Sequence, residues 1–175
     1  VLLIEGYTPA DVQLSTAVEN RDTLVLTFVG TSDRIQIIET LNGSAADQIE
    51  EIRFEDGTVW TMDTVRAALV TAQQTSGDDV VTAFSFVETL QGGLGDDTLS
   101  GLDGSDTYVF TRGDGRDIID DNGNRDTDVL QIEGYTPSEV LLSQAPSNRN
   151  TLIIEFAGTS DRIQIIDTLG GSAAD

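Results

Sequence analysis

The first third of the chain alternates between apolar and polar residues with a period of two. Four short runs between residues 1 and 60 follow this rule. Their apolar positions are Leu2 and Ile4, Val12 and Leu14, Leu24, Leu26 and Phe28, and Ile35 and Ile37. Such alternation predicts strands that bury one face. Gly-Tyr-Thr-Pro at 6–9 and the stretch 29–33 predict turns between the strands.

A further pair of strands is predicted between Ile52 and Trp60. Asp56-Gly57 is typical of a type I′ hairpin turn. Such a turn would place Phe54 with Val59 on one face and Arg53 with Trp60 on the other. We therefore interpret Trp60, the only tryptophan, as a packing residue beside Arg53, although a ligand platform is the alternative interpretation.

The spacing becomes helical from Thr61 to Gln73. Val65, Ala68, Leu69 and Ala72 recur at intervals that place them on one helix face. Thr61 or Asp63 can supply the N-cap. We expect a short helix here that connects the antiparallel strands to the segment that follows.

From Gln74 to Gln131 the pattern has a period of nine. The nonapeptide GGLGDDTLS at 92–100 fills every position of G-G-x-G-x-D-x-U-x, a calcium-binding β-helix repeat in which U is a large apolar residue. Two-residue insertions precede Arg112 and Gly123. Six nonapeptides carry an acid at position six and an apolar residue at position eight. The acids are Asp79, Glu88, Asp97, Asp106, Asp117 and Asp128, and the apolar residues are Val81, Leu90, Leu99, Tyr108, Ile119 and Leu130.

Each part of this repeat has a physical role. Glycines permit a tight left-handed turn whose carbonyl groups point inward. The position-six carboxylate adds charge, and hard oxygen ligands of these two kinds suit Ca²⁺. Ordinary turn chemistry explains Gly-Asp pairs, but not an acid at every sixth position with an apolar residue two places later. A phosphate-binding P-loop at Gly92–Gly95 is excluded because no lysine follows it.

A long internal repeat sets the organisation of the whole chain. Residues 1–47 recur without a gap as residues 129–175, with 33 of 47 positions identical. Most differences fall on outward positions, such as Leu3 against Gln131. Because both ends of the chain fall inside a repeating unit, we expect a longer, repetitive parent protein.

Composition narrows the chemistry. The chain has 31 Asp and Glu against nine Arg, a formal net charge of −22, and no Lys, His or Cys. Residues 74–128 hold 13 of the acids and three Arg, so this segment would repel itself without cations. Disulfides, zinc sites of the usual kind and histidine-based catalysis are excluded. The charge argues against nucleic-acid and anionic-membrane partners, and no apolar run is long enough to span a bilayer.

Residues 74–131 resemble the RTX (haemolysin-type) calcium-binding β-roll. The stretch 106–120 and the strand pair 52–60 resemble the associated haemolysin-type calcium-binding-related domain. The resemblance implies a right-handed roll in which Asp79, Asp97 and Asp117 stack along one edge and the other three acids along the opposite edge. It implies Ca²⁺ between turns, with position-five residues such as Asp96 facing solvent. The turn Ala83–Glu88 departs from the pattern because it lacks every glycine.

The candidate calcium-binding residues are those that match the family's turns. They are Asp79, Glu88, Gly92, Gly93, Leu94, Gly95, Asp97, Gly101, Asp103, Gly104, Asp106, Gly113, Gly115, Asp117, Gly123 and Asp128. No catalytic site is expected, since paired acids such as Asp120 and Asp121 are interpreted as parts of calcium turns.

We expect an all-β protein in which a parallel calcium-binding β-roll alternates with antiparallel β segments in tandem, with one short helix. Residues 1–60 form the first antiparallel segment, 61–73 the helix or connector, 74–131 the roll, and 129–175 a truncated second copy of 1–47.

Two functions compete. The first is a calcium-dependent structural repeat of a large secreted bacterial protein, such as a rod, an adhesin stalk or an extracellular filament. Its partners would be calcium ions, neighbouring repeats and a surface or matrix ligand. The second is the accessory region of a secreted protease or lipase. The resemblance implies type I secretion in both cases, and the long repeat favours the first. A carbohydrate-binding module would rest only on Trp60 and Tyr7.

Overall fold

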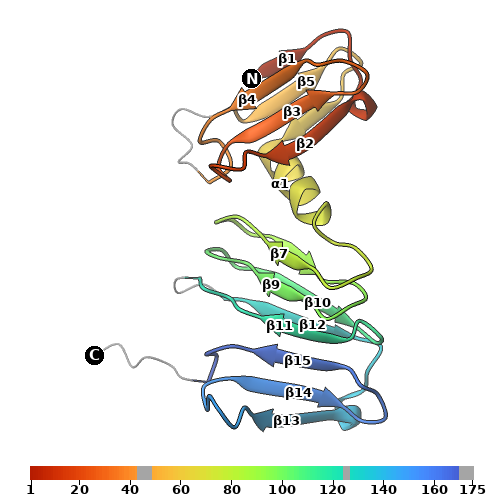
Figure 1. Ribbon diagram of the computed structural model, residues 1–175, viewed down its shortest axis with the longest axis vertical. Helices are drawn as coiled ribbons and strands as arrows, with labels where there is room; N and C mark the ends of the chain where they lie inside the picture. The colour runs from red at the N-terminus through yellow and green to blue at the C-terminus, as the bar shows by residue number, and fades with distance from the viewer. Residues whose placement is uncertain (43–48, 124–126, 170–175) are drawn as a thin grey trace, which may run out of the picture. The chain divides into compact units, whose positions relative to one another are not determined.

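The computed structural model describes residues 1–42, 49–123 and 127–169. The chain divides into two units, Val1–Thr71 and Ala72–Asp175. The repeated Gly-Ser-Ala-Ala-Asp stretch of both copies and residues 124–126 of the last nonapeptide lie outside the described residues. Figure 1 shows the order of the elements along the chain.

Unit 1 is a sandwich of two three-stranded sheets closed at one end by a helix. One sheet has the order β1-β5-β6 and the other the order β2-β3-β4. The strands are β1 (Leu2–Ile4), β2 (Val12–Thr16), β3 (Leu24–Phe28), β4 (Arg34–Ile37), β5 (Glu51–Phe54) and β6 (Val59–Thr61); a 3-10 turn (Pro9–Asp11) precedes β2. The alternating pattern places its apolar residues inward, since Ile4, Val12, Leu26, Phe28 and Ile37 are buried.

Thr61 directly precedes helix α1 (Met62–Thr71), and its hydroxyl accepts the backbone N–H of Thr64 at 3.2 Å. The helix contacts β2 and β6, the strands at one edge of each sheet. Val65 and Leu69 are buried as expected, whereas Ala68 is exposed and the side chain of Arg66 is buried instead. With ten residues, α1 is too short for a bilayer-spanning helix, and the rest of the described chain holds no candidate for one.

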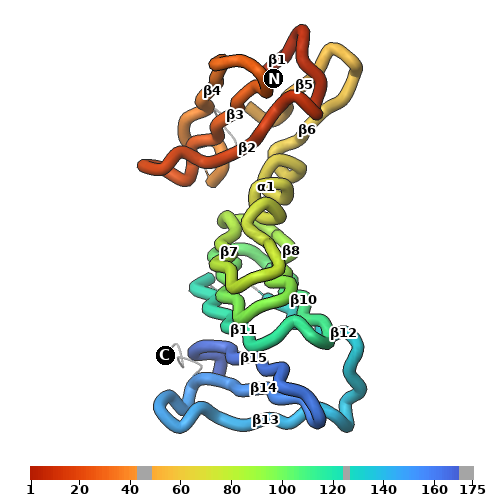
Figure 2. The backbone as a smooth tube through the Cα atoms, turned by 45° about the vertical axis from the view of Figure 1, so that its right-hand side comes forward, coloured from red at the N-terminus to blue at the C-terminus, as the bar shows by residue number. Residues whose placement is uncertain are grey.

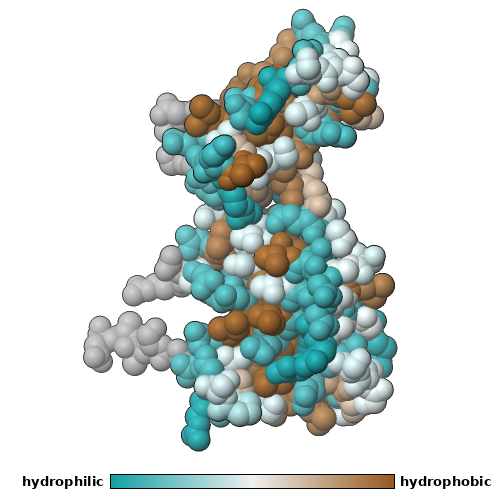
Figure 3. Space-filling view, in the orientation of Figure 1, coloured by the Kyte–Doolittle hydropathy of each residue, from teal (hydrophilic) through white to brown (hydrophobic). Residues whose placement is uncertain are grey.

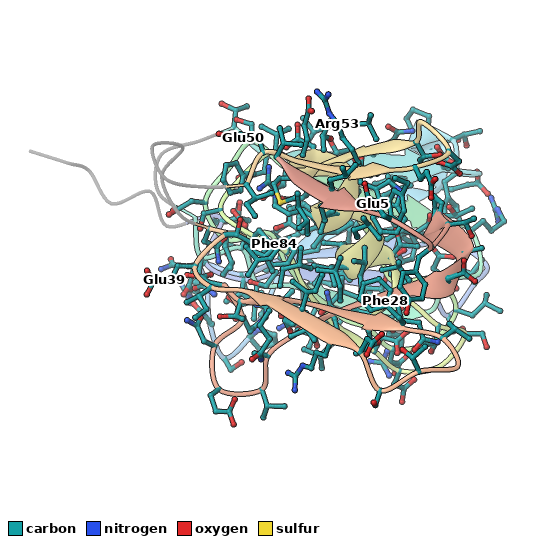
Figure 4. The ribbon with its side chains drawn as sticks, turned by 90° about the horizontal axis from the view of Figure 1, so that it is seen from above. Glu5, Phe28, Glu39, Glu50, Arg53 and Phe84 are labelled. Atoms are coloured by element: carbon teal, nitrogen blue, oxygen red, sulfur yellow. The ribbon has the colours of Figure 1, made fainter. Side chains whose placement is uncertain are left out.

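The predicted faces of the 52–60 hairpin are wrong. Ile52 pairs with Trp60 and Arg53 with Val59, because the turn is one residue longer than a type I′ turn. Phe54 donates its N–H to Thr58 at 2.9 Å, and Gly57 alone takes a positive φ, of 88°. Trp60 therefore packs edge-on against Phe54, with ring centroids 4.7 Å apart. Arg53 pairs with Glu51 and points away from the sandwich (Figure 4).

Unit 2 begins as a parallel β-roll. Its strands are β7 (Val80–Thr82), β8 (Thr89–Gln91), β9 (Thr98–Ser100), β10 (Thr107–Thr111), β11 (Arg116–Ile119) and β12 (Val129–Glu133). Each contains positions seven to nine of a nonapeptide or part of them. Odd and even strands alternate between two sheets, so β7, β9 and β11 form one parallel series and β8, β10 and β12 the other. The position-eight side chains of the first five turns are buried between the sheets.

The second copy of the repeated sequence continues the roll. A 3-10 turn (Pro137–Glu139) precedes β13 (Val140–Gln144), which is followed by β14 (Leu152–Phe156) and β15 (Arg162–Ile165). Strand β12 pairs in parallel with β10, and β15 pairs in parallel with β11. The sheet of β7, β9 and β11 therefore runs on through β15 into the antiparallel strands β14 and β13, whereas the other sheet ends at β12. Figure 2 shows these strands in the lower part of the chain. The expected all-β architecture, with parallel and antiparallel sheets and one short helix, is confirmed.

The stacking of the turns leaves no room for side chains at particular glycines. A Cβ atom on Gly104, where φ is +135°, would lie 1.7 Å from the carbonyl oxygen of Phe86 in the turn two repeats earlier. Gly113 also has a positive φ, of +100°, but nothing lies within 4 Å of its Cβ position.

We expect Gly113→Ala to cost about 1–2 kcal/mol, the strain of a left-handed alanine. Gly104→Ala should cost clearly more, because the same strain is joined by a backbone clash that separates two turns. Chemical denaturation followed by circular dichroism in calcium would measure both. Equal losses would mean that the turns are not stacked as described.

Candidate calcium-binding turns

The position-six carboxylates hold the turns in register. Along one edge of the roll, Asp97 accepts the backbone N–H of Asp79 at 2.8 Å, and Asp117 accepts that of Asp97 at 3.1 Å. Along the other edge, Asp106 accepts the N–H of Glu88 at 2.8 Å, and Asp128 accepts that of Asp106 at 3.0 Å. Each carboxylate thus uses one oxygen to bind the turn two repeats earlier, which leaves the second oxygen for another partner.

The second oxygens of Asp97 and Asp117 are buried without a hydrogen-bond donor. Asp97 is only 1% exposed and Asp117 only 3%. A buried carboxylate oxygen without a partner is costly unless a cation or a proton neutralises it. Burial raises the pKa of Asp97, and it raises the pKa of Asp117 from 3.8 to about 7. This edge of the roll therefore fits a bound cation held through oxygen, which is the chemistry that Ca²⁺ requires.

Two of the turns need glycine at position one because of their own carboxylates. A Cβ on Gly92 would lie 2.1 Å from Oδ2 of Asp97, and a Cβ on Gly101 would lie 2.2 Å from Oδ2 of Asp106. The carboxylate of each turn therefore folds back over the glycine that opens the turn. This explains the pairing of Gly with Asp at positions one and six of these two turns.

The opposite edge gathers three acids around one point. One carboxylate oxygen from each of Asp106, Asp121 and Asp128 lies within 4.8 Å of the others. Ca²⁺ binds oxygens at about 2.4 Å, so oxygens on opposite sides of one ion are about 4.8 Å apart. The cluster therefore has the dimensions of a calcium site. Asp106 and Asp128 were predicted as ligands, whereas Asp121 was interpreted only as part of a calcium turn.

Asp121 comes from the two residues inserted before the last nonapeptide. Tyr108 donates its hydroxyl to Asp121 at 2.8 Å and accepts the N–H of Gly101 at 2.8 Å. Burial, and then the nearby carboxylate of Asp128, raise the pKa of Asp121 to about 6. Burial and Asp121 also raise the pKa of Tyr108, so its hydroxyl remains a donor. An insertion breaks the nonapeptide frame, which is why the sequence assigned Asp121 to a calcium turn but not to this particular site.

The first turns depart from the repeat in the ways that their sequences indicate. Asp79 uses both carboxylate oxygens within its own turn, accepting from Thr75 N at 2.5 Å and Thr75 Oγ1 at 3.0 Å. The glycine-free turn is filled by Ala83 and Phe84, which are both buried, and its Glu88 is buried as well. The structure thus places both acids in the stacks, and Asp79 differs from Asp97 and Asp117 in using both oxygens within its own turn.

Position five forms a second, exposed ladder. Asp78 accepts the N–H of Asp96 at 2.9 Å, and Asp96 accepts that of Arg116 at 3.2 Å. Asp78 and Asp96 are exposed as expected, but their hydrogen bonds along the edge were not foreseen. Hydrophilic side chains form a band along the turns of unit 2 on the face shown in Figure 3. Position five therefore adds charge and registry beside the buried position-six acids.

The remaining candidate residues are carbonyl donors or turn residues. The side chains of Leu94 and Asp103 are exposed, and Leu94 could contribute to an ion only through its backbone carbonyl. Gly93, Gly95 and Gly115 take positive φ and lie against an earlier turn. Gly123 precedes the part of the last turn that lies outside the described residues. Asp114, which the pattern did not single out, is buried and accepts the N–H of Thr111 at 2.7 Å.

Two arginines lie at one end of the first stack. Arg116 and Arg162 line a pocket together with Asp96, Asp97 and Asp117. Arginine side chains therefore line the same pocket as the acids of this edge.

Comparison with known proteins agrees with this chemistry. Residues 24–64 match the family described as haemolysin-type calcium binding protein related domain. The resemblance to haemolysin-type calcium-binding proteins is confirmed. The matched residues lie in unit 1, so the assignment of ions to particular turns of unit 2 depends on the geometry above.

One solved structure and the curated proteins complete the comparison. The crystal structure of the extracellular lipase LipA from Serratia marcescens is similar to 94% of this chain at 18% sequence identity, with a TM-score of 0.41. The chain spans 31% of the length of that lipase. No curated protein matches the sequence.

Two adjacent acids provide a matched test of the ligand assignment. We expect Asp97→Ala to weaken calcium binding about tenfold or more, because it removes a charged oxygen from a buried site. Asp96→Ala removes the same charge from an exposed position and should weaken binding about threefold or less. Isothermal titration of both variants with Ca²⁺ is the measurement, and equal losses would contradict the assigned register.

The raised pKa of Asp117 predicts how the calcium-free roll responds to pH. The folded value of about 7 lies above the ordinary 3.8, so the folded state binds this proton more tightly than the unfolded chain. The stabilisation is complete below pH 3.8 and is lost as the pH rises through about 7. In chelator, the β signal of the roll in circular dichroism should therefore be larger at about pH 5 than at about pH 8.

The control for this prediction removes the proton-binding group. Asp117→Asn should reduce the difference between the two pH values, whereas Asp120→Asn, which removes a neighbouring charge, should leave most of it. Saturating calcium should reduce or reverse the difference in the unsubstituted protein, because the ion binds the deprotonated carboxylates. A calcium-free protein that is more stable at the higher pH would contradict the burial of Asp117.

Proposed function

We propose that this chain is a calcium-dependent structural repeat of a large secreted bacterial protein, with no catalytic role of its own. The observation that supports the proposal best is the continuity of the sheets at the repeat boundary. Thr107–Thr111 of the roll pairs residue by residue with Val129–Glu133, where the second copy starts. Arg116–Ile119 pairs in the same way with Arg162–Ile165. A roll followed by such a copy is built for end-to-end continuation.

Calcium would act as a condition for folding. Residues 74–128 hold 13 acids and three Arg, and Asp97, Asp106 and Asp117 are buried. Like charges at this density oppose compaction until a cation binds between the turns. A chain of this kind would stay expanded where calcium is scarce and fold where calcium is abundant, which suits a protein that is exported before it folds.

Extracellular location and type I export follow from the resemblance to haemolysin-type proteins. In that setting the partners would be calcium ions, neighbouring repeats and a surface or matrix ligand, and the assembly would be a rod, an adhesin stalk or a filament. The copy of residues 1–47 at 129–175 favours such an array, because sheets that continue from unit to unit give length and stiffness.

A calcium-binding accessory region of a secreted enzyme is the second candidate. The family match at residues 24–64 is compatible with it, since the same calcium sites would serve either protein. The two candidates differ in architecture: an array requires many 128-residue periods, whereas an accessory region requires a catalytic domain beside a single roll.

The calcium dependence of the fold is directly testable. In chelator, the β signal in circular dichroism should fall and the radius from small-angle scattering should rise. Calcium at about 10⁻⁴–10⁻³ M, the range of extracellular modules, should restore both. Magnesium should restore them poorly, because its preferred shell is smaller and stricter. An unchanged spectrum and radius on chelation would refute calcium-coupled folding.

Electron microscopy of the native protein in calcium would separate the two candidates. We expect rods or filaments with an axial repeat. Compact particles of uniform size would instead favour the accessory region of an enzyme.

A further inference from the structure

Both sheets of unit 1 end in an edge strand on the side opposite to α1. β1 is the last strand of one sheet and β4 the last strand of the other. The helix contacts β2 and β6, the strands at the opposite edges. Figures 1 and 2 show β1 and β4 at the end of this unit remote from α1, and Figure 4 looks down onto that end. We call β1, β4, Tyr7 and Asp33 the open face of unit 1.

The equivalent strands of unit 2 are not open. β12 repeats the sequence position of β1, and β15 repeats that of β4, at an offset of 128 residues. β12 receives β10 along its edge and β15 receives β11. Arg162 and Ile166 donate their N–H groups to Gly115 O and Ile119 O, each at 2.9 Å. The repeat therefore displays the same pair of strands once with a roll attached and once without.

Side chains fasten the roll to the second copy. Arg112 lies over the ring of Tyr135, with its guanidinium carbon 4.0 Å from the centroid. It donates to Gly134 O at 2.7 Å and to Glu139 Oε1 at 2.6 Å. Asp161 accepts the N–H of Gly113 at 2.6 Å and also binds the hydroxyl of Tyr135.

The ring of Tyr135 stacks on Phe156 at 3.9 Å, and Phe110 of the roll stacks on Phe156 at 5.4 Å. The contact between roll and copy thus combines two strand pairings, a guanidinium with three partners, a buried carboxylate and a stack of rings.

Unit 1 holds the receiving half of this contact already assembled. Tyr7 packs on Phe28 at 4.4 Å and donates its hydroxyl to Asp33 at 3.0 Å. Asp11 binds Thr8 with one oxygen, as Glu139 binds Thr136, which leaves its other oxygen for an arginine on a side chain one methylene shorter than that of Glu139. These residues correspond one for one to Tyr135, Phe156, Asp161 and Glu139.

Equivalent residues of the two copies differ in exposure where only the second copy contacts a roll. Asp161 is 7% exposed, whereas Asp33 is exposed. Ile163 is fully buried and Ile35 only partly so. Ile38, which follows β4, is 73% exposed, and its equivalent Ile166 is half-buried. An edge strand with apolar neighbours and outward N–H groups is a template for pairing with another chain segment.

We propose that the open face of unit 1 docks the last turns of another β-roll of this same kind, a second copy of residues 74–123. The inference rests on the proposed structural function and names the partner and the surface for it. The incoming Arg112 would lie over Tyr7 and reach Gly6 O and Asp11. The incoming Gly113 would donate to Asp33, while β10 and β11 would extend the sheets at β1 and β4.

The test adds a roll in front of the intact protein. An additional copy of residues 72–128 is joined to Val1 as Asp128 is joined to Val129, so that the whole chain is kept. Amide hydrogen exchange by NMR is then compared with that of the unextended chain, both in calcium. The amides of Arg34 and Ile38 should exchange at least about tenfold more slowly in the extended protein. In the unextended chain they should exchange faster than those of Arg162 and Ile166.

Substitutions check the side-chain contacts. In the extended protein, Asp33→Ala should raise the exchange rates of Arg34 and Ile38, while Glu19→Ala, an exposed acid in the β2–β3 loop, should not. In the unextended chain Asp33→Ala should leave these rates unchanged, because no roll is then joined in front of unit 1 to donate a hydrogen bond to Asp33.

The same samples separate this inference from the proposed function. If the added roll folds with calcium but Arg34 and Ile38 exchange as in the unextended chain, the docking is wrong and the calcium-dependent structural role stands. If the two amides become protected equally in calcium and in chelator, the docking stands and calcium-dependent folding is wrong.

Discussion

The fold of unit 2 depends on one repeated interaction, in which a position-six carboxylate accepts a backbone N–H from the turn two repeats earlier. Because Asp97 binds Asp79 and Asp106 binds Glu88 in this way, every turn fixes the height of the next one along its edge. The same geometry buries one carboxylate oxygen of Asp97 and of Asp117 without a donor. The regular backbone stack therefore comes with a row of buried negative charge. A bound cation would offset the cost of burying that charge.

The period-nine pattern was sufficient to predict the roll because each position of the repeat has a local cause. Position eight must be apolar since Leu90, Leu99 and Ile119 are buried between the sheets. Position one is glycine at Gly92 and Gly101, where the carboxylate of the same turn covers it. The alternating strands of residues 1–42 were predictable for a similar reason. Because one face of each strand is buried, every second residue is apolar, and this alternation is present in both copies.

What the sequence could not predict lies where the frame is interrupted or where a turn sets the register. Asp121 belongs to an insertion, so its place beside Asp106 and Asp128 follows from the path of the chain and not from spacing. The hairpin at 52–60 was assigned the wrong faces because one additional turn residue shifts the pairing by one, which exchanges the two sides of a strand. Trp60 therefore meets Phe54, and Arg53 is left to pair with Glu51.

Comparison of the two copies of the antiparallel segment also indicates its role, because each copy has a different neighbour. Leu14 is half-buried where α1 contacts β2, whereas its equivalent Leu142 is exposed on β13. Asp161 is buried where the roll meets β15, whereas its equivalent Asp33 is exposed on β4. Among the described residues, the first copy has no roll at β4, and the second copy has no helix at β13. A segment whose two ends are each completed by a different neighbour is a connector, and a helix at one end with a roll at the other makes the connection directional. Under the proposed function, directional connectors of this kind would favour open linear assemblies over closed ones.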